Sequence, residues 1–201
     1  MKHLLIALFA CSSLSAFSQY EKESTTQDVA RVTFLAPGFS FEKKVTRTST
    51  LYAHAFMSAS FEFNYSSSMG TESRFYFDPA ITGQYRFYYN GDKRFAKGNR
   101  TTLNSMEYIA PVYQATFTKR RISTSNYEES SRRAINAVGA VWGLQRNLEN
   151  RISIDVSVGP GVMFTKITKP DAYGNPINDN ATRFTVMGEL TFGLWLNKKT
   201  N

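Results

Sequence analysis

The sequence predicts an all-β fold, a closed eight-stranded antiparallel up-and-down transmembrane β-barrel. Apolar and polar residues alternate with a period of two along most of the chain, and no long run shows the 3.6-residue period of an amphipathic helix. After the first residues, no stretch approaches the roughly 20 apolar residues that a transmembrane helix needs. Two kinds of connection alternate between the segments, as they do when successive strands form hairpins.

Residues 1–18 are predicted to form a signal peptide. A basic start and an apolar run too short to span a bilayer precede the small-x-small sequence at residues 16–18. Cleavage before Gln19 would remove Cys11, the only cysteine, so the mature chain could form no disulfide. The alternatives are a buried N-terminal strand or helix, and a lipid-modified Cys11.

The rest of the chain is predicted to form one domain. A short N-terminal segment (19–28) precedes the barrel domain (29–197), and a C-terminal tail (198–201) follows it. The formal net charge is +8 and the isoelectric point is about 9.6. Nucleic acid is nevertheless not an expected partner, because the chain has an export signal and no nucleic-acid-binding motif.

Eight strands are predicted in chain order. The segment 29–45 contains the turn signal Pro37-Gly38, which divides it into two short strands. Six longer strands are predicted within residues 51–65, 74–89, 105–119, 132–145, 151–165 and 182–196. The connections of one kind are 44–50, 90–104 and 145–150, and those of the other kind are 36–38, 66–73, 122–132 and 168–181.

The strand faces follow from this alternation. In 182–196, one face carries Phe184, Val186, Leu190, Phe192 and Leu194, opposite Arg183, Thr185 and Glu189. In 132–145 both faces are small or apolar, and Trp142 and Leu144 favour the even-numbered face as the apolar one.

The size of the barrel predicts which face is inside. An eight-stranded barrel has room for filling side chains or one small ligand, so the many large aromatic residues would not fit. We therefore expect the aromatic face to contact lipid and the polar face to line a plugged, nearly fully paired lumen. The predicted lumen network is Glu42, His54, Glu62, Arg74, Asp78, Arg86, Asp155, Arg183 and Glu189. A soluble lipocalin-like binding barrel is the alternative interpretation.

Tyrosine and tryptophan near the strand ends are typical of the aromatic girdles of membrane barrels. The candidates are Tyr52, Tyr65, Tyr88, Tyr89, Tyr108, Trp142 and Trp195.

In this pattern the chain resembles the small eight-stranded outer-membrane β-barrels of Gram-negative bacteria, the OmpA/OmpX-type class. The resemblance covers essentially all of the mature chain, and it implies a place in the cell outer membrane with lipid and lipopolysaccharide as partners. Members of the class often end with an aromatic residue, whereas here Leu196 is followed by residues 197–201, "NKKTN". The resemblance implies an architecture and no particular activity.

The sequence indicates no catalytic, cofactor or metal site. His54, Ser58 and Glu62 share a face and could suggest acyl transfer. A spacing of four residues on a strand, however, separates side chains by roughly 13 Å, and His54 is expected near the periplasmic end. A lipid A acyl hydrolase or transferase, and a small pore, remain alternatives to a structural or surface-interaction protein.

Basic residues bracket the predicted outer loop 122–132. The candidate contacts to lipopolysaccharide phosphates are Lys119, Arg120, Arg121, Arg132 and Arg133, because guanidinium groups bind phosphate in a bidentate way. The alternative is that they are solvated charges. Loops 122–132 and 168–181 are the expected contacts for an extracellular protein or surface ligand.

Overall fold

The structure, a computed structural model, describes residues 26–66, 70–118, 132–171, 173 and 175–198. The predicted signal peptide 1–18 lies outside the described residues, and within them no helix is long and apolar enough to cross a membrane.

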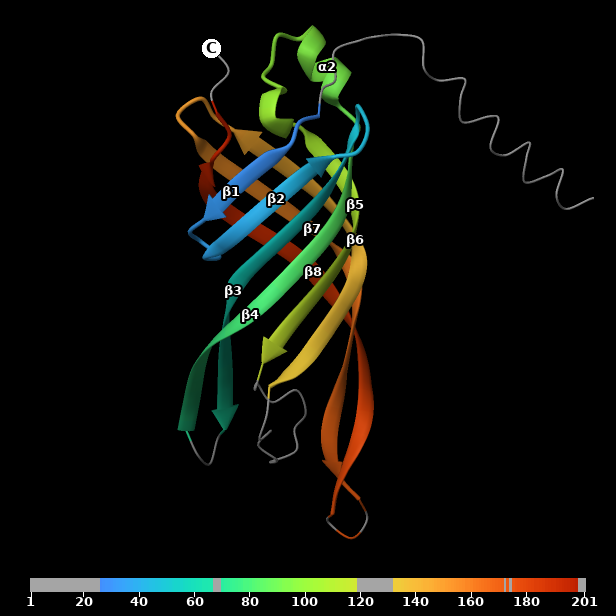
Figure 1. Ribbon diagram of the computed structural model, residues 1–201. Helices are drawn as coiled ribbons and strands as arrows, with labels where there is room; N and C mark the ends of the chain where they lie inside the picture. The colour runs from blue at the N-terminus through green and yellow to red at the C-terminus, as the bar shows by residue number, and fades with distance from the viewer. Residues whose placement is uncertain (1–25, 67–69, 119–131, 172, 174, 199–201) are drawn as a thin grey trace, which may run out of the picture.

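Eight antiparallel strands, each paired with its neighbours in chain order, close into a ring (Figure 1). They are β1 (Val29–Thr33), β2 (Gly38–Lys44), β3 (Ser49–Ser66), β4 (Gly70–Tyr88), β5 (Glu107–Thr118), β6 (Arg133–Asn147), β7 (Ile152–Pro170) and β8 (Pro176–Trp195). The all-β, up-and-down, eight-stranded prediction is therefore confirmed, including the division of 29–45 before Gly38.

The two predicted loops 66–73 and 168–181 are shorter in the structure than the sequence predicts. The β3–β4 ladder continues to the pair Ser66 and Gly70, and the β7–β8 ladder continues to the pair Pro170 and Pro176. Most of 66–73 and 168–181 is therefore paired strand. The polar composition of these segments indicated loops, but backbone hydrogen bonds between two strands do not require an apolar face.

The long connection 90–104 contains two helical turns that the sequence did not predict. They are α2 (Gly91–Ala96) and the 3-10 helix η2 (Thr102–Asn104), and Asn104 has a positive φ of 62°. The Asn104 amide accepts a hydrogen bond from the Gln27 nitrogen at 2.7 Å and donates one to the Gln27 oxygen at 2.8 Å. This clamp fixes the chain just before β1.

The two ends of the ring differ. One end, called here the closed end, carries α2, η2 and the turns 45–48 and 148–151 (Figure 1). At the other, the open end, the hairpins β3–β4 and β7–β8 extend beyond the short β1–β2 hairpin. β1 pairs with β8 only between Arg31–Thr33 and Gly193–Trp195, and the β2–β3 ladder ends at Gly38 and Phe56.

Large apolar side chains point outward. We call the following exposed residues the outer apolar belt: Phe39, Phe41, Leu51, Phe75, Phe77, Ile81, Tyr85, Phe87, Ile109, Tyr113, Phe117, Val138, Trp142, Val156, Val158, Val162, Phe164, Phe184, Val186, Leu190, Phe192 and Leu194. In β6 the even-numbered face is the exposed one, as predicted, because Trp142 is 46% exposed while Val141 is 3% exposed.

The interior of the ring is largely polar. Among the described residues, buried polar and charged residues outnumber buried apolar ones, and a small apolar cluster fills only part of the interior. In that cluster the Tyr108 ring covers Gly143 of the neighbouring strand. A side chain at position 143 would therefore displace the ring.

We expect Gly143→Ala to destabilise the fold by about 1–3 kcal/mol, because the added methyl group overlaps Tyr108 and overpacks the interior. The measurement is urea unfolding of the purified protein, followed by tryptophan fluorescence. Gly83→Ala is the matched control, since a methyl group there meets no atom within 4 Å. Equal stability of the two variants would contradict this account of the interior.

Candidate functional site

Arg86 of β4 lies at the centre of a polar cluster near the closed end. Its guanidinium carbon is 3.6 Å from the centroid of the Tyr52 ring and 4.2 Å from that of Tyr108. Its Nη1 donates to Asp155 Oδ2 at 2.7 Å and to Gln145 Oε1 at 2.6 Å. Its Nε donates to Gln84 Oε1 at 2.8 Å, so two aromatic faces and three oxygen acceptors replace the water that this cation has lost.

Glu42 of β2 is the second centre of the cluster. Its carboxylate accepts hydrogen bonds from Arg31 Nη2 at 2.6 Å, from the Tyr88 hydroxyl at 2.5 Å and from Thr50 Oγ1 at 2.7 Å. Arg86 Nη1 is 3.7 Å from Glu42 Oε2, so the two centres form one network. Every charged member is almost completely buried.

We call this network the interior plug. It consists of Arg31, Glu42, Thr50, Tyr52, Gln84, Arg86, Tyr88, Tyr108, Gln145 and Asp155, which come from seven of the eight strands. The two arginines balance the two carboxylates, so the plug carries no net charge. Neutrality matters because an uncompensated charge in a dry interior costs several kcal/mol.

His54 forms a second polar group that lies next to the plug. Its Nδ1 is 2.9 Å from Glu189 Oε1, its Nε2 is 3.1 Å from Thr33 Oγ1, and its ring stacks on Phe56 with centroids 4.4 Å apart. The Tyr52 hydroxyl donates to the same Glu189 oxygen at 3.0 Å and connects this group to the plug.

Thr33, His54 and Glu189 are connected in the same order as the nucleophile, base and acid of a catalytic triad. Their hydrogen bonds, however, do not suit catalysis. A nucleophilic hydroxyl must give its proton to the histidine. The Thr33 hydroxyl instead donates to the Ala36 carbonyl at 2.5 Å, and all of His54 is buried. We therefore interpret the group as a structural contact between β1, β3 and β8.

The structure brings together some of the predicted lumen residues and separates others. Glu42, Arg86 and Asp155 meet in the plug, and His54 meets Glu189. Ser58 lies in a cavity away from His54, and Glu62 pairs with Arg74 in backbone register, their side chains lying outside the description.

One predicted lumen residue is not in the interior, and another is in the interior without a partner among the described residues. Arg183 is on the inward parity of β8, but it is exposed, because β8 has no β1 partner beyond Gly193 and the wall is open at that height. Asp78 is buried but unpaired, so the network is not fully paired. Residues of opposite charge can share the inward face and still lie at different heights along the strands, too far apart to pair.

Four of the predicted girdle residues point inward instead. Tyr52, Tyr88, Tyr108 and Trp195 are buried, whereas Tyr89 and Trp142 are exposed and hydrogen-bonded to each other at 2.8 Å. The sequence already indicates that not all candidates share the lipid parity: Tyr88 is two residues from Arg86 and therefore shares its face.

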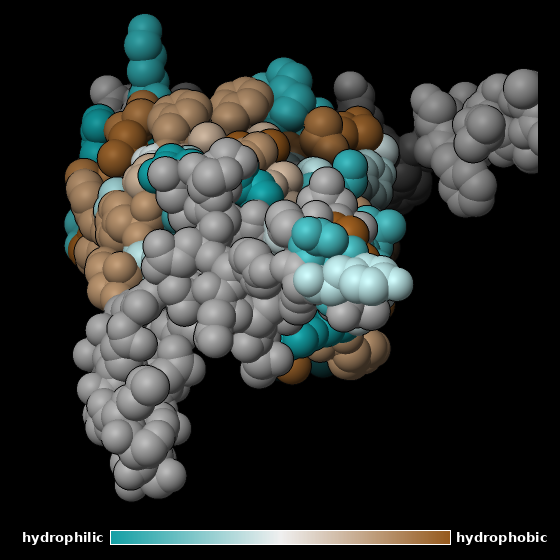
Figure 2. Space-filling view, turned by 90° about the horizontal axis from the view of Figure 1, so that it is seen from below, coloured by the Kyte–Doolittle hydropathy of each residue, from teal (hydrophilic) through white to brown (hydrophobic). Residues whose placement is uncertain are grey.

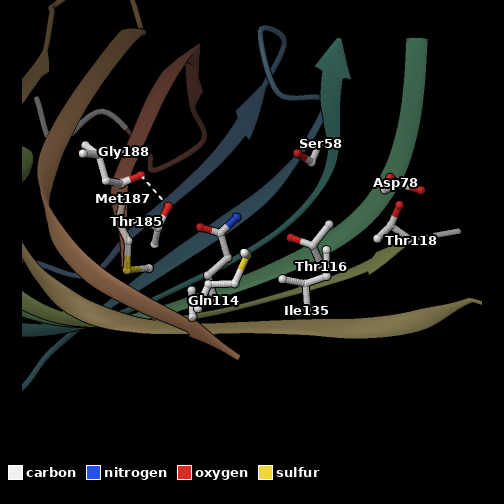
Figure 3. A pocket seen from close by; sticks show the side chains of 12 residues that line it. Ser58, Asp78, Gln114, Thr116, Thr118, Ile135, Thr185, Met187 and Gly188 are labelled. Atoms are coloured by element: carbon white, nitrogen blue, oxygen red, sulfur yellow. Dashed lines mark hydrogen bonds between the residues drawn. The ribbon is translucent and has the colours of Figure 1, made fainter. Parts of the chain in front are cut away.

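A cavity of about 230 Å³ occupies the interior towards the open end (Figure 3). We call it the open-end cavity. Its lining includes Ser58, Asp78, Gln114, Thr116, Met163 and Met187. Met187 also belongs to the small apolar cluster, which shares Tyr88 and Tyr108 with the plug and therefore connects the plug to the cavity.

The predicted phosphate-binding residues are only partly described. Lys119, Arg120 and Arg121 lie outside the described residues, and Arg132 is exposed. Arg133 donates to the Lys166 carbonyl at 3.3 Å, and both residues line a groove of about 510 Å³ together with Phe164.

Among the residues that the structure describes, no group of three His, Cys, Asp or Glu side chains could hold a metal ion. Comparisons with protein families, with curated proteins and with solved structures found no match to this chain.

We expect Arg86→Met to destabilise the protein by about 3–5 kcal/mol, because Asp155 would remain buried without its cation. Adding Asp155→Asn should restore part of this loss, since the charge left behind is then removed. Urea unfolding measures both effects.

Arg100→Met is the control, because its ion pair with Glu149 is exposed and should contribute at most about 1 kcal/mol. An Arg86→Met variant as stable as Arg100→Met would show that the plug does not hold the ring together.

Proposed function

We propose that the protein is an outer-membrane β-barrel with a lumen plugged by side chains, and that it has a structural or surface-interaction role. The observation that carries the proposal is the inverted distribution of side chains: the outer apolar belt faces outward while paired charges fill the interior. A water-soluble protein has the opposite distribution.

The outer apolar belt supports a lipid environment. It covers β2 to β8, and Figure 2, a view towards the open end, shows apolar side chains gathered along the side of the molecule. Soluble monomers rarely expose contiguous apolar patches of more than a few hundred Å². Where each strand is paired with both neighbours, the ring also leaves few backbone groups unpaired towards hydrocarbon.

Aromatic residues near the closed end support a membrane boundary there. The exposed Trp142 indole donates to the Tyr89 hydroxyl at 2.8 Å, and that hydroxyl donates to Glu107 at 3.3 Å. Tryptophan and tyrosine prefer the interface because one part of each ring system is apolar and the other is polar. The closed end would then face the periplasm, because its turns 45–48 and 148–151 are short, as periplasmic turns of membrane barrels are.

The open end would face outward and carry the interactions. Arg132 and Arg133 flank the predicted outer loop 122–132, and Lys166 shares a groove with Arg133. These cations suit the phosphates of lipopolysaccharide. A lipid-modifying enzyme is the weaker proposal, because the Thr33 proton is already committed to a backbone carbonyl.

Arginine at Val156 or Leu190 tests membrane insertion, since these exposed residues face each other across β7 and β8. Each substitution should cost about 2–4 kcal/mol if the residue lies near the bilayer midplane. Assembly is measured in liposomes by the faster gel migration of the unheated protein. Asn150→Arg, in an exposed turn at the closed end, is the control.

If Val156→Arg assembles like Asn150→Arg, or if the protein is recovered as a stable soluble periplasmic protein, the membrane proposal is wrong.

Planar bilayers test the plug. The wild-type protein should show no steady, sizeable conductance, because the interior plug fills the ring near the closed end. Steady conductance would make the protein a pore. Altered lipid A acylation on expression that disappears in His54→Ala would instead make it an enzyme.

A further inference from the structure

The open-end cavity contains a buried carboxylate without a partner. Asp78 of β4 is 6% exposed and lines the cavity beside Ser58, with which it is paired in register across β3 and β4 (Figure 3). Among the described residues, no hydrogen bond or ion pair reaches its side chain. Its charge is therefore left to the contents of the cavity, either water or a bound cation.

The cations of the interior do not compensate Asp78. Arg86 is eight residues away on the same strand, about 26 Å at the rise of a β-strand. Arg133 lies two strands away, opposite Thr118 in register, and its Nη1 donates to the Lys166 carbonyl at 3.3 Å. Arg183 is exposed. The carboxylate therefore remains available inside the cavity.

The surroundings of Asp78 define the chemistry of a ligand. Ser58, Gln114 and Thr116 line the cavity and make no hydrogen bond to other described residues, so two hydroxyl oxygens and an amide oxygen are available as acceptors. Met163 and Met187 add flexible apolar surface to the lining. The lining thus combines one negative charge, neutral oxygen acceptors and an apolar wall.

We propose that the open-end cavity binds a small primary alkylammonium ion. The ammonium group has three N–H donors, which match the Asp78 carboxylate and the neighbouring neutral oxygens. The alkyl chain would pack against the two methionines. A volume of about 230 Å³ is sufficient, since a cavity of roughly 150 Å³ binds benzene. The site is inside the ring and does not depend on lipid around it.

A metal ion fits the cavity less well. Calcium takes six to eight oxygen ligands, usually including several carboxylates, and magnesium demands near-octahedral geometry. Asp78 is the single carboxylate among the described lining residues. An ammonium ion needs only one charged partner and fewer fixed directions.

The test is calorimetric titration of the full chain in detergent with n-butylammonium chloride, and with 1-butanol as the uncharged probe of similar size. The wild-type protein should bind the ammonium ion and not the alcohol. Asp78→Asn should weaken binding about ten- to a hundredfold, the value of a hydrogen-bonded charge pair. Glu149→Gln, an exposed carboxylate at the closed end, should bind like the wild type.

Asp78→Asn also reports on folding. Without ligand it should be at least as stable as the wild type, because it removes a buried charge that no described residue compensates. Equal binding of the alcohol and the ammonium ion, or unchanged affinity in Asp78→Asn, would overturn the proposal. Binding that appears only in Arg133→Gln would also overturn it, since Arg133 would then be the ion-pair partner of Asp78 in the wild type. Displacement of the amine by micromolar calcium would overturn it as well, because the site would then be a calcium site.

Discussion

The arrangement of the strands depends on how Arg86 is accommodated in a narrow interior. Its guanidinium group cannot lose its proton, so every face of it needs a partner once water is excluded. Tyr52, Tyr108, Gln145 and Asp155 supply these partners from β3, β5, β6 and β7. A slip of one residue in any of these strands would turn a partner outward and an apolar residue inward. One buried cation therefore specifies the register of five strands.

The outer surface follows from the same constraint. Because side chains alternate along a strand, residues that bring charges inside also bring large apolar neighbours outside. Arg86 is flanked by Tyr85 and Phe87, both of them exposed. The interior cannot take them, since an eight-stranded ring has no room for so many aromatic rings. The paired interior and the apolar exterior are thus one feature, and the membrane proposal rests on both together.

The sequence could predict those features of the fold that depend on residues close together in the chain. Period-two alternation, the turn at Pro37-Gly38 and the parity of Glu42 and Arg86 all depend on neighbouring residues. Strand ends were less predictable, because the polar segment 168–181 keeps pairing through its backbone alone. The contact between His54 and Glu189 joins residues 135 positions apart, and it arises only when the ring closes. Parity gives the face of a residue but not its height, which is why Asp78 was expected to be paired.

The two halves of the interior have different physical characters. Near the closed end, the arginines and carboxylates compensate one another, and the plug stabilises the ring. Towards the open end, the Asp78 carboxylate faces the cavity and no described residue pairs with it. The apolar cluster joins the halves, since Tyr88 and Tyr108 belong to the plug and Met187 lines the cavity. A ligand that enters from the open end would stop at this cluster and leave by the same route. Such an interior can bind a small cation without conducting one, so the cavity and the plug are compatible.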